Sequence, residues 1–123
     1  MKKILLLIGL IALFCVPTIA SAKTSTEWIE YWAKVYGVNP YQMISVAICE
    51  SELNTNAFNR TDGVGGSRGL FQYQTTTWNM FSQELGEELD IWSAYDQSKL
   101  TAYAWSKDRQ NHWSCYKSLY KRS

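Results

Sequence analysis

Glu50 is the acidic side chain whose place in the sequence best suits acid catalysis. It ends an apolar segment, and Val46 and Ala47 lie four and three residues before it, on its own face of a helix. Burial disfavours a charged carboxylate, and so does the partial negative charge at the C-terminal end of a helix. A carboxylic acid that stays protonated near neutral pH can serve as the general acid that cleaves a glycosidic bond. The alternative is an exposed acid at a helix end, as we expect for Glu52.

The composition excludes several other kinds of chemistry. His112 is the single histidine, so a Ser-His-Asp triad would have to use it. One histidine and three cysteines are too few for a zinc site of His and Cys ligands, and we expect neither a metal nor a cofactor. A formal net charge of +1 over 123 residues argues against a nucleic-acid partner. Six Trp, eight Tyr and four Phe are enough to fill a core, to line a groove for flat ligands, or both.

The N-terminus has the pattern of a secretory signal peptide. Lys2 and Lys3 precede the uncharged run Ile4–Val16, and the small residues Ala20-Ser21-Ala22 follow at the spacing of a cleavage site. The run is too short for a membrane span of about 20 residues. We therefore predict a signal peptide over residues 1–22, export to the periplasm or the extracellular space, and no stable membrane insertion after cleavage. An uncleaved N-terminal anchor is the alternative.

Removal of this leader leaves one domain, residues 23–123, in which we find no repeat and no linker. Ten basic and eleven acidic side chains remain, so the net charge becomes −1. Cys15 is lost with the leader, and Cys49 and Cys115 most simply form one disulfide in an exported chain. Closing a loop of about 66 residues would stabilise the domain by roughly 4 kcal/mol in the chain-entropy model.

Helix signals dominate this domain. Thr24 and Glu27 match a capping box, and Gly37 ends the helix that follows. Asn39-Pro40 then predicts an N-cap with proline at the first helical position. The helix that starts there and ends near Glu50 is apolar on nearly every side, so we expect it to be the buried centre of a small α domain.

The remaining segments predict a long loop and shorter helices. Residues 53–69 are rich in Gly and Asn, which indicates a functional loop or a short hairpin. Helical spacing returns over 75–85, Ser93 can open a further helix, and a last short turn surrounds Cys115. The expected fold is mostly α.

An ordered set of motifs over residues 40–116 resembles the lysozyme-like lytic transglycosylase family, which includes soluble lytic transglycosylases, goose-type lysozymes and small secreted relatives. In that family a Glu-Ser pair ends the central helix, and a Gly-Leu-Met-Gln-like stretch follows about twenty residues later. Here Gly69 lies nineteen residues after Glu50, and Phe71 replaces the usual methionine. The matching motifs are Glu50-Ser51, Gly69-Leu70-Phe71-Gln72, Thr77-Trp78, Tyr95-Asp96-Gln97, Ala102-Tyr103 and His112-Trp113-Ser114-Cys115-Tyr116.

The resemblance implies an α+β lysozyme-like fold in which Glu50 is the catalytic acid and base. It implies that Ser51 supports the substrate or the glutamate, with helix capping as the alternative. The disulfide would hold the backbone of the acid still. The expected substrate-binding residues are Ser51, Gly69, Leu70, Phe71, Gln72, Tyr73 and Tyr103: the backbone of Gly69–Phe71 and Gln72 would line the cleft, as would the rings of Phe71, Tyr73 and Tyr103. Gln72 could instead bond the loop backbone, and Tyr103 could belong to the core.

The resemblance also implies a reaction and a partner. The partner is the peptidoglycan glycan strand. A single glutamate of the enzyme cleaves the MurNAc–GlcNAc β-1,4 bond of that strand and closes a 1,6-anhydro ring. Goose-type lysozymes place a water-positioning aspartate near Asp62, so a hydrolytic muramidase is the alternative, although Asp62-Gly63 is also a plain turn signature.

Two further alternatives lie outside this chemistry. One is a non-catalytic glycan-binding module, and the other is a partner-binding role through surface Trp28 and Trp92. We expect a monomer, which could serve a secretion, conjugation or wall-remodelling assembly.

Overall fold

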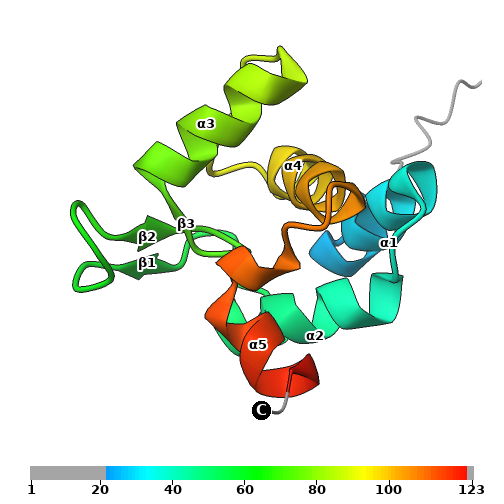
Figure 1. The fold of residues 1–123 in the computed structure, drawn as a ribbon, viewed down its shortest axis with the longest axis horizontal. Coiled ribbons are helices and arrows are strands. Elements are labelled where there is room, and N and C mark those ends of the chain that lie inside the picture. Colours follow the sequence, from blue (N-terminus) through cyan, green and yellow to red (C-terminus); the bar gives the residue numbers. More distant parts are fainter. Residues whose placement is uncertain (1–21, 122–123) are drawn as a thin grey trace, which may run out of the picture.

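The computed structural model describes residues 22–121, so the expected signal peptide lies outside the described residues except for Ala22. Within this range the chain forms a mostly helical domain with one small sheet, as predicted (Figure 1). The elements in chain order are α1 (Ser25–Tyr36), α2 (Pro40–Ser51), β1 (Phe58–Asn59), β2 (Ser67–Arg68), β3 (Tyr73–Gln74), α3 (Thr75–Leu85), α4 (Ala94–Ser106), the 3-10 turn η1 (Gln110–His112) and α5 (Ser114–Tyr120).

The first two helices begin and end at the residues that local signals predict. The Thr24 hydroxyl accepts a hydrogen bond from the Glu27 N–H at 3.2 Å, and the Glu27 carboxylate accepts one from the Thr24 N–H at 3.2 Å. This reciprocal pair satisfies two backbone donors that lack partners within the helix. Gly37 adopts φ +70° at the C-terminal end of α1, and the Asn39 side chain caps α2 with Pro40 as its first residue.

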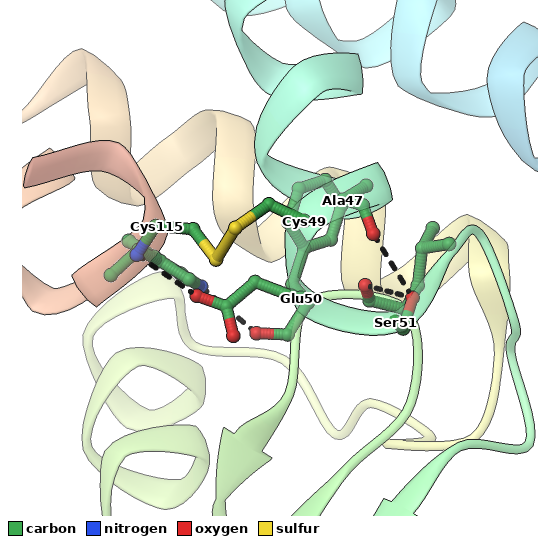
Figure 2. Close-up of a disulfide and its surroundings, with 8 residues drawn as sticks. Ala47, Cys49, Glu50, Ser51 and Cys115 are labelled. Atoms are coloured by element: carbon green, nitrogen blue, oxygen red, sulfur yellow. Dashed lines mark hydrogen bonds between the residues drawn. A yellow bond between two sulfur atoms is a disulfide. The ribbon is translucent and has the colours of Figure 1, made fainter. Parts of the chain in front are cut away.

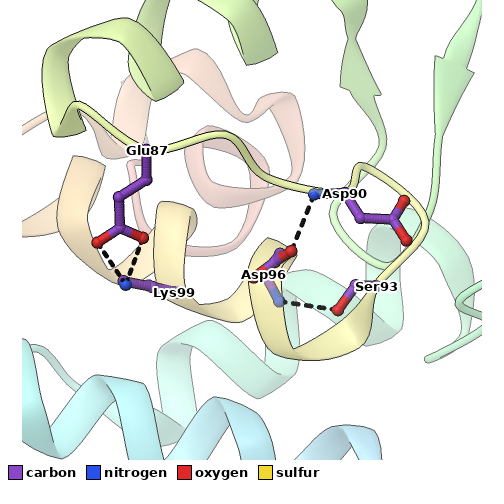
Figure 3. A network of polar contacts seen from close by, with 5 residues as sticks. All are labelled: Glu87, Asp90, Ser93, Asp96 and Lys99. Carbon is purple, nitrogen blue, oxygen red and sulfur yellow. Dashed lines mark hydrogen bonds and ion pairs between the residues drawn. The ribbon is translucent and has the colours of Figure 1, made fainter.

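The connection between α3 and α4 is held by charged and polar side chains (Figure 3). The Ser93 hydroxyl accepts the Asp96 N–H at 3.1 Å, which caps α4 as the sequence predicts. The Asp96 carboxylate in turn accepts the Asp90 N–H at 2.8 Å. Farther along α4, Lys99 is ion-paired with Glu87 at 2.5 Å. These bonds fix the loop that leads into α4.

The Gly/Asn-rich segment is a hairpin rather than an open loop. Strands β1, β2 and β3 form an antiparallel sheet in that order, with Phe58 opposite Arg68 and Arg68 opposite Tyr73. The hairpin extends away from the helices in Figure 1, and residues 60–66 connect its strands. Each strand has two residues, which is too short for the period-two pattern that reveals strands in a sequence.

The most buried helix is α4, so the prediction that α2 is the buried centre of the domain is wrong. On α2, Tyr41 is 78% exposed and Ile48 is 49% exposed. The reason is that α4 is buried through small side chains and through polar ones such as Gln97 and Thr101, which are hydrogen-bonded. An apolar pattern does not reveal such a helix. Its buried residues are Gln97, Ser98, Leu100, Thr101, Ala102, Ala104 and Trp105.

Candidate active site

A cavity of about 320 Å³ lies at the C-terminal end of α2. It is bounded by α2, the hairpin, the start of α3 and the C-terminal segment, so four separate parts of the chain meet there. Both carboxylates that the sequence singled out, Glu50 and Asp62, line it. The lining residues are Glu50, Asp62, Gln72, Tyr73, Gln74, Thr77, His112, Trp113, Ser114 and Lys117.

The Glu50 carboxyl group is half-buried in this cavity, as the sequence pattern predicts. Burial raises the pKa of Glu50 above its ordinary value. The Cys115 N–H donates to Glu50 Oε1 at 3.4 Å, and this bond lowers the pKa because it favours the charged form (Figure 2). The negative charge of Asp62 raises it again. Burial has the largest effect, so the protonated carboxyl persists to higher pH than in an exposed glutamate.

The predicted disulfide is present and lies beside Glu50. Cys49 on α2 is bonded to Cys115 on α5, with their Cα atoms 6.0 Å apart (Figure 2). Cys49 immediately precedes Glu50, and Cys115 supplies the N–H that contacts its carboxylate. The covalent bond therefore holds the acid and its hydrogen-bond donor against each other.

Ser51 joins the end of α2 to the segment that follows the hairpin. Its hydroxyl lies 2.7 Å from the Leu70 carbonyl oxygen and 3.2 Å from the Ala47 carbonyl oxygen, and the residue is 8% exposed. Figure 2 shows Ser51 and Cys115 on opposite sides of the C-terminal end of α2. Ser51 thus positions the loop and its own helix, and its hydroxyl does not line the cavity.

We expect Ser51→Ala to lower the free energy of unfolding by about 1–3 kcal/mol, because the buried Leu70 carbonyl loses its hydroxyl donor. Urea unfolding of the two proteins measures this difference. The matched control is Ser45→Ala on the same helix, whose hydroxyl bonds Tyr41 O of its own helix at 2.9 Å, and which we expect to change stability by less than about 0.5 kcal/mol. Equal effects of the two substitutions would contradict the bridging role.

The Gly69–Phe71 segment lies in the interior, and the expectation that the Phe71 ring lines the cleft is wrong. Leu70 and Phe71 are both 0% exposed, so neither side chain is available to a ligand. The Phe71 N–H donates to Gln97 Oε1 at 2.7 Å, and its carbonyl accepts the Trp113 Nε1–H at 3.0 Å. Both backbone polar groups of Phe71 are thus bonded to buried side chains, and its ring lies in the core.

Gln97 is a buried organising residue whose role the sequence did not reveal. Besides the Phe71 N–H, its amide contacts the Arg68 carbonyl at 2.9 Å and the Ile91 carbonyl at 2.5 Å. Gly69, at φ +78°, lies so close that a Cβ there would be 2.0 Å from the Gln97 nitrogen. Gly69 therefore allows the close approach of a side chain rather than of a substrate.

Gln72 lines the cavity, but its side chain bonds the protein. Its Nε2 donates to the Gly69 carbonyl at 2.9 Å and to the Ala57 carbonyl at 3.2 Å. Its Oε1 accepts the Ser67 hydroxyl at 2.7 Å. The alternative that Gln72 bonds the loop backbone is thus confirmed. These three bonds hold the residue at φ +53°, a region that few residues other than glycine adopt.

The two tyrosines expected at the cleft lie in different places. Tyr73 lines the cavity, but it is 2% exposed and its hydroxyl is bonded to Thr101 Oγ1 at 2.8 Å. Tyr103 is half-buried on α4, with its ring 6.0 Å from that of Tyr36 on α1. Tyr103 is not among the lining residues, so the structure does not bring it to the cavity with Glu50.

Asp62 reaches the cavity from the exposed connection between β1 and β2. The neighbouring Gly63 has φ +67°, and a Cβ there would lie 2.6 Å from the Gln74 side-chain nitrogen. The loop therefore lies directly against the start of α3. This contact places the second carboxylate in the same cavity as Glu50.

One wall of the cavity consists of residues to which the sequence reasoning gave no role there. His112, Ser114 and Lys117 all come from the C-terminal segment. A signal for them was present, because a Cys49–Cys115 bond must bring the neighbours of Cys115 next to Glu50. The sequence of α5 by itself carries no such signal.

A larger cavity of about 640 Å³ lies along α3, and Trp78 and Ser82 are among its lining residues. Its two carboxylates, Glu87 and Glu88, are exposed, and Glu87 is ion-paired with Lys99. It therefore offers no buried acid comparable to Glu50.

Residues 22–121 contain no group of three or more His, Cys, Asp or Glu side chains arranged to hold a metal ion. None of the helices in this range is long and apolar enough to cross a bilayer. The chain matches no protein-family model, no curated protein and no solved structure. The assignment of function therefore depends on the geometry around Glu50 and on the sequence motifs.

Proposed function

We propose that this chain is an exported peptidoglycan lytic transglycosylase with a lysozyme-like fold, and that Glu50 is its catalytic acid and base. The observation that carries the proposal is the half-buried Glu50 carboxyl, with a raised pKa, facing a polar cavity at the end of α2. The helix that ends in Glu50-Ser51 and the hairpin that follows agree with the motifs of that family. The disulfide favours an oxidising compartment outside the cytoplasm.

In the first half of the reaction Glu50 acts as the acid. Its proton moves to the oxygen of the MurNAc–GlcNAc bond, the bond from that oxygen to the muramyl C1 breaks, and the GlcNAc end leaves as an alcohol. The substrate's own N-acetyl group stabilises the cation that develops at C1. The raised pKa of Glu50 keeps the necessary proton in place at higher pH.

In the second half Glu50 acts as the base. Its carboxylate takes the proton of the muramyl 6-hydroxyl, whose oxygen bonds to C1 and closes the 1,6-anhydro ring. The Cys115 N–H favours the charged form that this half requires, whereas burial favours the neutral form of the first half. Both forms of one carboxyl are thus supported, and no water is consumed.

The nature of the products tests the proposal. The mature protein incubated with purified peptidoglycan should release fragments that end in anhydromuramyl groups. Mass spectrometry distinguishes them, because each is lighter by one water than the hydrolytic fragment. Products with reducing ends alone would refute the transglycosylase assignment.

A hydrolytic muramidase is the second candidate, because Asp62 lines the same cavity as Glu50. A water held by Asp62 could then attack C1 in place of the 6-hydroxyl. Carboxyl pairs of this kind serve as acid and base in inverting glycosidases.

Asp62→Asn separates the two candidates. If the transglycosylase is correct, anhydromuramyl products persist. The negative charge of Asp62 raises the pKa of Glu50, so its removal lowers that pKa and the falling, high-pH limb of the rate profile moves to lower pH. If Asp62 positions water, reducing-end products should instead fall by about 10²-fold or more. The pH profile of product release, resolved by mass, gives both results.

A further inference from the structure

The cavity wall formed by the C-terminal segment carries a positive charge that the proposed mechanism does not use. Lys117 on α5 lines the cavity together with His112 and Ser114. Across the described part of the chain, it is the single Lys or Arg among the lining residues, and it shares the cavity with the carboxylates of Glu50 and Asp62.

The ammonium group of Lys117 is available to a ligand. Lys99 is ion-paired with Glu87, and Arg109 with Glu84. Lys117 is exposed and has no ion pair within residues 22–121. Its charge is therefore not neutralised by a carboxylate of the described protein.

The backbone that carries Lys117 is fixed against the site. Its N–H donates to the Trp113 carbonyl at 3.2 Å, and Trp113 is 5% exposed and bonded to Phe71 O. Two residues before Lys117, Cys115 is covalently attached to the residue that precedes Glu50. The backbone of Lys117 therefore has a fixed position on the cavity wall.

The charges of the cavity select among glycans. A strand of neutral N-acetyl sugars gains little from an ammonium group. A strand that bears carboxylates is repelled by Asp62, and by Glu50 whenever that group is ionised, unless a cation lies nearby. Muramyl strands carry such carboxylates, either on the lactyl group or on the peptide attached to it.

We propose that Lys117 is a specificity-determining residue that binds a carboxylate of the muramyl strand. The cavity thereby prefers carboxylate-bearing glycans to neutral ones. The inference rests on the proposed function for its substrate class, but it is tested by binding rather than by cleavage.

The experiment uses the full mature chain with Glu50→Gln, so that bound strands stay intact. The probes are muramyl strands freed of peptide, which keep their lactyl carboxylates, and the same strands with those carboxylates converted to amides. We expect the native strand to bind about fivefold more tightly than the amidated one at low salt. When Lys117→Met is added to the Glu50→Gln variant, this preference should disappear. When Lys117→Arg is added instead, the preference should remain. In about 0.5 M salt the preference should shrink, because charges are then screened over a few ångströms.

Lys121→Met is the matched control, since Lys121 lies just beyond α5 and does not line the cavity. It should keep the preference in full. Equal binding of the two strands, a preference that survives Lys117→Met, or no binding of either strand would overturn the inference. Wild-type protein incubated with the same native strands reports separately on the proposed function through its anhydromuramyl products.

Discussion

Glu50→Gln should reduce the release of anhydromuramyl products by about 10²- to 10⁴-fold, the usual contribution of a positioned acid or base. The amide has nearly the same shape as the protonated carboxyl, but it cannot give up a proton to the glycosidic oxygen. Fragments released from purified peptidoglycan and quantified by mass spectrometry measure this loss. The folded domain should persist, because an uncharged amide removes the burial penalty that raises the pKa of Glu50.

Glu52→Gln is the matched control for this change. Glu52 lies two residues farther along the chain, at the C-terminal end of α2 with φ +54°, and it is exposed and outside the cavity. Its amide variant should cleave at the wild-type rate. Wild-type turnover by Glu50→Gln in the same assay would remove the catalytic role of Glu50 and favour a non-catalytic glycan-binding module.

Gly69→Ala should lower the free energy of unfolding by roughly 2–4 kcal/mol, a large effect for the addition of one methyl group. The backbone at φ +78° disfavours any side chain, and the new Cβ would lie 2.0 Å from the Gln97 nitrogen. The displaced amide would leave the buried Phe71 N–H and the part-buried carbonyls of Arg68 and Ile91 without their partner. Guanidinium unfolding measures the change.

Gly86→Ala separates the backbone part of this effect from the steric part. Gly86 ends α3 at φ +76°, close to the value at Gly69, but a Cβ there would meet nothing within 4 Å. Its substitution should therefore cost about 1–2 kcal/mol, the price of the left-handed conformation alone. Similar losses at Gly69 and Gly86 would contradict the close approach of Gln97.

Local signals in the sequence were sufficient where each feature depends on a few neighbouring residues. The caps at Thr24, Asn39 and Ser93 are such features, because a cap is a hydrogen bond to an N–H two or three residues away. The burial of Glu50 is partly local as well, since its face of α2 also carries Val46 and Ala47.

Local signals failed where a residue is defined by distant contacts. Gln97 is of a residue type usually found at the surface, yet it is fully buried. Its amide bonds backbone groups of two other segments, Arg68 and Phe71 in one and Ile91 in the other. Phe71 was expected at the cleft because of the motif it belongs to. Its N–H donates to Gln97 and its carbonyl accepts from Trp113, and its ring is directed inward. Tyr103 likewise lies against Tyr36 rather than at the cavity.

The sequence by itself determined the helical class of the domain, the disulfide pairing, and Glu50 as the acid to examine. These follow from short-range hydrogen bonds, from the side-chain period of a helix, and from the presence of two cysteines in the predicted mature chain. The tertiary structure decided which groups surround Glu50, because it brings Asp62 and Lys117, which lie 12 and 67 residues after Glu50, to one cavity. The physical reason is that the pKa of a carboxyl and the attraction of a charged ligand depend on distances in space. The packing of α5 and the hairpin against α2 sets those distances.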